Sequence, residues 1–325
     1  MKRTEFDPSG ISRRRLLAGA AGLAGMSAVR AAQAAPPAPG LKVAIFSKHL
    51  RHLEGEALAR GASEIGFDGI DLAVRKNGHV EPAQVNQDLP KLVDIIRRHH
   101  LEVPMLTTDI VDADTPHAED VLQAMRELGI RYYRWGGFKY DYTQPIAPQL
   151  EALKPRVARL AELNRRYRTT AMYHTHSGVG VVGASIWDLH IILRDFDPDA
   201  VGVNYDVGHA VIEGGIGGWI NSFHITGRHL RGIAIKDCMW VKDAKRGWKA
   251  EFVPLGTGMV RFEKFFGMVK QSGFSGPLQI HFEYPLGGAN DGARTLTMSQ
   301  DEVFSAMKRD LGKLRAFLKE AGLSA

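Results

Sequence analysis

Strand-like and helix-like runs alternate eight times between residues 41 and 325, and this alternation constrains the fold more than any other feature of the sequence. The strand-like runs are short, apolar and rich in β-branched residues, whereas the runs between them carry apolar residues at helical spacing. The expected strands are 43–47, 69–74, 103–107, 131–135, 170–174, the start of 201–209, 230–236 and 278–283. The expected helices are 54–64, 89–100, 118–128, 148–167, 185–194, 219–226, 261–271 and 302–321.

Eight such units in one stretch predict a protein of the α/β class, a single (β/α)8 TIM barrel over residues 41–325. A barrel of this kind typically needs about 250 residues. A doubly wound open sheet is the alternative, but the sequence has nothing that resembles a glycine-rich nucleotide-binding loop. Two connections that follow strands, 138–146 and 238–260, are longer than usual and would lie over the active-site face as lids.

The first 34 residues have the pattern of an export signal rather than of a folded segment. Three consecutive arginines, Arg13 to Arg15, precede a run of Ala, Gly and Leu, and Ala32-Gln33-Ala34 follows as a small-residue cleavage site. This order predicts a twin-arginine signal peptide over 1–34, with the export machinery as a partner and a periplasmic or secreted location. The apolar run is only 14 residues long, so we expect no stable membrane anchor. Three prolines mark 35–40 as a linker.

Net charge and cysteine content argue against nucleic-acid binding and against a fold stabilised by disulfides. The chain carries a net charge of +6, but residues 1–34 contribute +4 of this, so the remainder is close to neutral at +2. The chain without residues 1–34 therefore lacks the excess positive charge that would favour binding to nucleic acid. Cys238 is the only cysteine, which excludes an internal disulfide and favours a packing role for that side chain.

Alternation along the expected strands places many ionisable side chains inside the barrel. Inward residues at the C-terminal ends of barrel strands build the active site of this fold. Burial of so many polar groups is costly unless they pair with one another or hold a metal. The inward residues expected from the fifth to the eighth strand are Met172, His174, His176, Asn204, Asp206, Gly232, Ala234, Lys236, His281 and Glu283.

Several short motifs at strand ends resemble those of one known family. They are Gly66-Phe67-Asp68-Gly69-Ile70-Asp71-Leu72, Tyr173-His174-Thr175-His176-Ser177-Gly178, Asp206-Val207-Gly208-His209, Ile235-Lys236-Asp237, Pro254-Leu255-Gly256-Thr257-Gly258 and Ile280-His281-Phe282-Glu283-Tyr284. In this order the motifs are similar to those of the xylose isomerase-like TIM barrel superfamily, which includes sugar phosphate isomerases and epimerases. The resemblance spans residue 41 to the C-terminus.

The resemblance implies a divalent metal held by Glu, Asp, His and Glu from strands five to eight. Asp206 and Glu283 match two of these positions, whereas His174 stands in place of the first Glu and Ala234 in place of the His. Alanine cannot bind a metal, so the expected ligands are Asp206, Glu283 and His174, with His176 as a further ligand within reach. This donor set suits Mn²⁺, Zn²⁺, Fe²⁺ or Co²⁺. The alternative, buried charges that only pair with one another, stays open.

The same resemblance implies proton abstraction next to a carbonyl by two facing glutamates, of which only Glu283 is present. The expected catalytic residues are Glu283, Lys236 and His176, and Lys236 could instead form a structural ion pair with Asp206 or Glu283. Four further residues are expected to bind substrate, although capping or packing roles are open for the first two. They are Asp71, Trp135, Asn204 and His209.

These residues lead to three functional hypotheses. The first is a sugar isomerase or epimerase that acts on a non-phosphorylated sugar or keto-sugar, because export argues against a phosphorylated substrate. The second is a lyase or dehydratase that acts on a keto-inositol or keto-glycoside and needs only one good base. The third is a non-catalytic sugar-binding barrel, suggested by Ala234. An abasic-site nuclease is disfavoured by the near-neutral charge, and the sequence predicts no oligomeric state.

Overall fold

The computed structural model describes residues 40–245 and 247–324, and within them eight parallel strands close into a barrel. Each strand pairs with the next along the chain, and the last pairs with the first. The single (β/α)8 barrel is therefore confirmed, whereas the expected signal peptide and residues 35–39 of the linker lie outside the described residues. The barrel strands are β1 (Val43–Phe46), β2 (Gly69–Val74), β3 (Glu102–Thr108), β4 (Tyr132–Trp135), β5 (Thr170–His174), β6 (Val201–Asp206), β7 (Leu230–Ile235) and β10 (Leu278–Ile280).

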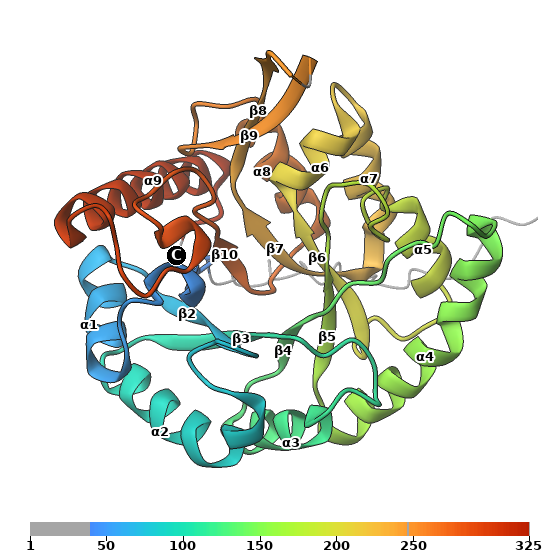
Figure 1. Ribbon diagram of the computed structural model, residues 1–325, viewed down its shortest axis with the longest axis horizontal. Helices are drawn as coiled ribbons and strands as arrows, with labels where there is room; N and C mark the ends of the chain where they lie inside the picture. The colour runs from blue at the N-terminus through green and yellow to red at the C-terminus, as the bar shows by residue number, and fades with distance from the viewer. Residues whose placement is uncertain (1–39, 246, 325) are drawn as a thin grey trace, which may run out of the picture. The chain divides into compact units, whose positions relative to one another are not determined.

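Helices surround the strands of the barrel (Figure 1). Their apolar faces pack against the outward side chains of the strands, which gives one continuous core between the two layers. The α-helices are α1 (Gly55–Ile65), α2 (Val85–Arg98), α3 (Ala118–Leu128), α4 (Ile146–Tyr167), α5 (Trp187–Leu193), α6 (Val207–Gly214), α7 (Gly218–Thr226), α8 (Phe262–Ser272) and α9 (Gln300–Ala321). Short 3-10 turns are η1 (Ser47–Leu50), η2 (Pro82–Gln84), η3 (Gly227–His229) and η4 (Ala289–Asp291).

Capping residues in the sequence account for where the closing helix begins and ends. The Ser299 hydroxyl accepts the backbone N–H of Glu302, and the Glu302 carboxylate accepts the backbone N–H of Ser299. Such a cap contributes about 1 kcal/mol to helix stability. At the other end the chain turns at Gly322, whose φ of +68° lies in the left-handed region that favours glycine. Within the described residues, no helix combines the length and apolar character required to cross a bilayer.

Two helices follow β6, whereas the sequence predicted one over 219–226, so that prediction missed α6. Asp206 ends β6 and caps α6, because its Oδ1 accepts the backbone N–H of His209 at 3.0 Å. A Cβ at Gly214 would lie 2.1 Å from the backbone nitrogen of Trp219. Gly214, the last residue of α6, therefore lets the chain reverse tightly into α7.

The connection 238–260, expected as a loop, contains an antiparallel hairpin made of β8 (Asp237–Asp243) and β9 (Gly247–Val253). The hairpin extends beyond the barrel strands on the side of α6 and α8 (Figure 1). The buried Asp237 carboxylate anchors its base by accepting backbone N–H groups from Cys238, Gly256, Gly258 and Val260 at 2.8–3.2 Å. The sequence analysis missed this hairpin because the ladder is local and only half-buried, so its apolar residues give a weak signal.

Candidate active site

The ammonium group of Lys236 lies at the centre of a buried charge cluster at the C-terminal end of the barrel. Its Nζ is 2.8 Å from Glu283 Oε2 and 3.1 Å from Asp206 Oδ2, and it donates to His209 Nε2 at 2.6 Å. Lys48 Nζ approaches the other oxygen of Glu283 at 3.9 Å. The side chains of Lys236 and Asp206 are 1% and 0% exposed, so water does not screen their attraction.

The two carboxyl groups that share Lys236 have different proton affinities. Burial raises the pKa of Asp206 to about 6, although the charge of Lys236 opposes the rise. Burial also acts to raise the pKa of Glu283, but the charges of Lys236 and Lys48 outweigh it and hold the value at about 2. Two carboxyl groups with separated pKa values are a common basis for dividing acid and base roles in an active site.

His209 links the charge cluster to the loop that follows β5. Its Nε2 accepts from the Lys236 ammonium, so its Nδ1 carries the proton and donates to Ser177 Oγ at 2.8 Å. The Phe252 ring from β9 covers this pair, with Lys236 Nζ 4.6 Å from its centroid and the imidazole of His209 5.4 Å away edge-on. The hairpin therefore shields the ammonium group from solvent.

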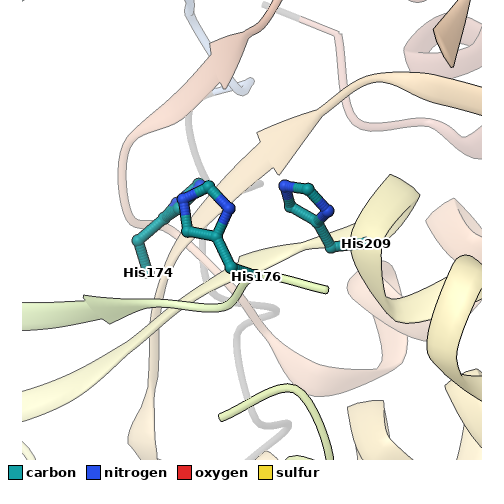
Figure 2. Close-up of side chains that lie close together, drawn as sticks. All are labelled: His174, His176 and His209. Carbon is teal, nitrogen blue, oxygen red and sulfur yellow. The ribbon is translucent and has the colours of Figure 1, made fainter. Parts of the chain in front are cut away.

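Four imidazoles lie side by side in the same region, three of which Figure 2 shows. The ring of His174 is 4.7 Å from that of His176 and 5.3 Å from that of His281, and the rings of His176 and His209 are 4.5 Å apart. Burial, followed by nearby positive charges, lowers the pKa of each, to about 3 for His176. All four rings are therefore neutral near pH 7, which is the form in which an imidazole binds a metal.

One group among these side chains fits a divalent cation. One ligand atom each from His174, Asp206 and His281 lies within 4.8 Å of the others. Both nitrogens of His174 and Nε2 of His281 have no hydrogen-bond partner within the described residues, and Asp206 Oδ2 has no well-directed hydrogen bond. Asp206 Oδ2 lies 3.1 Å from Lys236 Nζ, 3.5 Å from His174 Nε2 and 3.9 Å from His281 Nδ1. A second group, His174, His176 and His209, fits less well because His176 and His209 already hold hydrogen bonds and no carboxylate takes part.

On β4 the arginine rather than the tryptophan points into the barrel. Arg134 donates to His176 Nε2 at 2.9 Å. Trp135 is 1% exposed, its indole N–H donates to the carbonyl oxygen of Val111 at 2.7 Å, and its ring packs edge-on against Tyr173. Trp135 therefore packs against the neighbouring strand β5, and the structure does not bring it to the cluster.

Asp71 and Asn204 are both buried in the barrel. Burial raises the pKa of Asp71 to about 7, although the Thr107 hydroxyl donates to both carboxylate oxygens at 2.9 and 3.0 Å. Asn204 is paired in register with His174, and neither polar atom of its amide has a partner within the described part of the chain. Asn204 is therefore left with hydrogen-bonding capacity inside the barrel.

Most of the expected site residues lie together, and sequence reasoning missed three neighbours. The expected residues that share the cluster are Asp206, Glu283, Lys236, His174, His176 and His209. The sequence analysis assigns no role to Arg134, Ser177 or Phe252. Strand alternation alone would have found Arg134, because it is paired in register with the inward Met172. No periodic signal marks Ser177, which lies in a loop.

The comparisons with known proteins agree with the fold and define the family. The family model described as "Xylose isomerase-like TIM barrel" matches residues 59–301, and the chain belongs to this family. A comparison with curated protein sequences gave no match.

Solved structures of enzymes share this fold at low sequence identity. L-ribulose 3-epimerase superposes with a TM-score of 0.64 at 17% identity, over 87% of this chain and 96% of that one. The 3-keto-D-glucoside 4-epimerase of E. coli gives 0.58 at 15% identity, over 85% and 99%. A probable 3-DHS dehydratase from Bacillus anthracis gives 0.60 at 14% identity, over 82% and 98%. At these identities the likeness extends to the fold alone.

Proposed function

We propose that the protein is a sugar isomerase or epimerase that removes a proton next to the carbonyl group of a non-phosphorylated keto-sugar. The observation that carries this proposal is the Lys236 ammonium held between Glu283 and Asp206 at the C-terminal end of the barrel. A buried cation beside an ionised carboxylate suits abstraction of a proton and stabilisation of the enolate that results.

In this proposal Glu283 takes the proton and Lys236 stabilises the negative oxygen. A carboxylate with a pKa near 2 is a weak base, so the base becomes stronger when the substrate oxygen draws the ammonium group away from Glu283. His176 serves the opposite face of the carbon, with Arg134 donating to its Nε2. Asp71 and Asn204 bind the hydroxyl groups of the sugar, and His209 orients the ammonium group of Lys236.

We also propose that His174, Asp206 and His281 hold a divalent metal, Mn²⁺, Zn²⁺, Fe²⁺ or Co²⁺. When bound, the metal would polarise the carbonyl and the neighbouring hydroxyl of the sugar. Glu283 is left out of this set because it does not belong to the group of ligand atoms that lie within 4.8 Å of one another. Ala234, paired in register with Asp206, supplies no ligand from β7.

A lyase or dehydratase that acts on a keto-inositol or keto-glycoside is the second candidate function. The observation that favours it is His174 at the end of β5, where the family resemblance implies a second glutamate. Elimination needs one base and one acid, and a single Glu283 as base with the Lys236 ammonium as proton donor beside it meets that requirement. The third hypothesis, a non-catalytic sugar-binding barrel, would not account for this buried charge cluster.

Incubation with keto-sugars in deuterium oxide tests the proposed reaction. Deuterium at the carbon next to the carbonyl, with the carbon skeleton and all hydroxyl groups retained, is expected for an isomerase or epimerase. Deuterium together with loss of a hydroxyl group or aglycone would support the lyase instead. Binding of keto-sugars with no exchange in any of them would favour the silent binding barrel.

We further propose that the protein is exported to the periplasm through the twin-arginine pathway, on the basis of Arg13, Arg14 and Arg15 before the apolar run. Replacing all three with lysine should keep the protein in the cytoplasm as the uncleaved precursor. Export of this variant at the normal rate would overturn the assignment.

A further inference from the structure

A groove opens beside the charge cluster, between the loop after β4, the loop after β5, helix α6 and the hairpin. Its volume is about 670 Å³, within the range of small-molecule pockets. Four of the nine large apolar side chains exposed in the described part of the chain line it. These four are Tyr142, Ile146, Val179 and Trp240. Such a gathering of exposed apolar surface around one concavity indicates a ligand.

Hydrogen bonds hold the two loops of this groove in place. The Tyr140 backbone N–H donates to the Gly180 carbonyl oxygen at 2.8 Å, and the Tyr142 hydroxyl accepts the Gly180 N–H at 2.8 Å. The rings of Tyr140 and Tyr142 lie stacked with centroids 6.4 Å apart. Tyr140 and Tyr142 are therefore already held in place before a ligand binds. A ring that stacks on them binds with little loss of conformational entropy in the protein.

The charges of the groove select against an anionic ligand. None of the described residues that line it is a lysine or an arginine. Its two carboxylates already accept hydrogen bonds, Asp188 from the Tyr140 hydroxyl at 2.6 Å and Glu213 from the Gly178 backbone N–H at 2.8 Å. A phosphate or carboxylate group would therefore meet negative charge with no counterion, whereas a neutral ring with a flat apolar face would meet Tyr142 and Trp240.

Ser177 connects the groove to the proposed site of reaction. It lines the groove, and its hydroxyl accepts from His209, which in turn accepts from Lys236. A ligand that contacts Ser177 in the groove is therefore separated from the Lys236 ammonium group only by the side chains of Ser177 and His209. This chain of contacts suits one molecule with two parts, one part reacting at the charge cluster and the other bound in the groove.

We propose that this groove binds the neutral ring attached to the reacting sugar, so that the substrate class is a glycoside with an aromatic aglycone or a second sugar rather than a free monosaccharide. This inference rests on the proposed function for the reacting half of the substrate. The shared chemistry of the two ring types is a flat apolar face that stacks on an aromatic side chain.

Calorimetric titration of the full chain with methyl β-D-glucoside, phenyl β-D-glucoside and cellobiose tests the groove without requiring turnover. We expect phenyl glucoside or cellobiose to bind about tenfold more tightly than methyl glucoside, which corresponds to one stacked ring. The two ligands distinguish an aryl group from a second sugar. Tyr142→Ala and Trp240→Ala should each reduce this preference, and thermal melting checks that both variants fold.

Trp248→Ala is the matched control, because Trp248 is exposed on the same hairpin but does not line the groove. The Trp248→Ala variant should bind phenyl glucoside or cellobiose more tightly than methyl glucoside by the same factor as the wild type. Equal affinity for all three glucosides, or a preference that survives in both groove variants, would overturn the proposal. If the deuterium exchange assay shows no exchange but the preference for phenyl glucoside or cellobiose is preserved, the proposed reaction is wrong and the proposed role of the groove still holds.

Discussion

Lys236 and Glu283 form an ion pair of 2.8 Å inside the barrel, and the same ammonium group lies 3.1 Å from Asp206. One positive charge thus offsets two carboxyl groups, one at the end of β6 and the other in the segment that follows β10. Because the lysine side chain is 1% exposed, its removal would leave negative charge in a medium of low polarity with no replacement from solvent. The pair therefore serves both stability and the proposed reaction.

Replacing Lys236 with methionine should lower both stability and activity. Breaking a buried ion pair by removing one partner costs roughly 3–5 kcal/mol. Loss of a charge that stabilises an enolate lowers turnover by about 10²–10³-fold. Urea unfolding measures the first effect and the exchange assay the second.

Lys242→Met is the matched control for this change, because Lys242 is exposed on the hairpin and lies over Trp248. It should alter neither stability nor turnover. If Lys236→Met does not fold, Lys236→Arg keeps the charge and should fold while losing activity. Full turnover in Lys236→Met would contradict the role given to the ammonium group.

The proposed metal site predicts that the purified protein, loaded with Mn²⁺, Zn²⁺, Fe²⁺ or Co²⁺, retains about one ion for each chain. His174→Gln and His281→Gln should each weaken retention at least about tenfold, because each removes one donor. Elemental analysis after dialysis measures the stoichiometry. His224→Gln changes an exposed histidine on α7 and should leave it unaltered. A wild-type protein that stays empty after loading with all four ions would exclude the metal.

The raised pKa of the Asp71 carboxyl group predicts how the stability of the protein depends on pH. Its carboxyl has a pKa of about 7 in the folded protein, raised by burial from 3.8. The folded state therefore holds this proton more tightly than the unfolded state, so the stability it contributes is full below about pH 4 and is lost as pH rises through 7. Asp71→Asn keeps a neutral side chain at every pH.

Between pH 5 and pH 8 the wild type should therefore lose roughly 2–3 kcal/mol more stability than Asp71→Asn. Urea midpoints at the two pH values measure this difference. Asp94→Asn, a change at an exposed carboxylate on α2, should retain the wild-type pH dependence. An identical pH dependence in Asp71→Asn and wild type would show that Asp71 does not titrate in this range.

Regular alternation made the barrel predictable from the sequence, and irregular local contacts made the rest of the site unpredictable. The inward positions of Asp206, Lys236 and Glu283 follow from strand periodicity, and the structure brings all three together. The same rule applied to β4 selects Arg134, yet the aromatic character of Trp135 directed the sequence interpretation to the wrong neighbour. Periodicity does not reveal contacts made by loops or by added hairpins, such as those of Ser177 and Phe252.

The most direct test of the account is solvent deuterium exchange into a keto-glucoside by wild type, Glu283→Gln and Glu251→Gln. The last is a control at a carboxylate on β9, 2.7 Å from Lys249 and exposed. Wild type and Glu251→Gln should place deuterium at the carbon next to the carbonyl, whereas Glu283→Gln should fold normally and exchange at least about 10²-fold more slowly. Exchange at the wild-type rate in Glu283→Gln, or turnover without deuterium incorporation in the wild type, would contradict proton abstraction by this carboxylate.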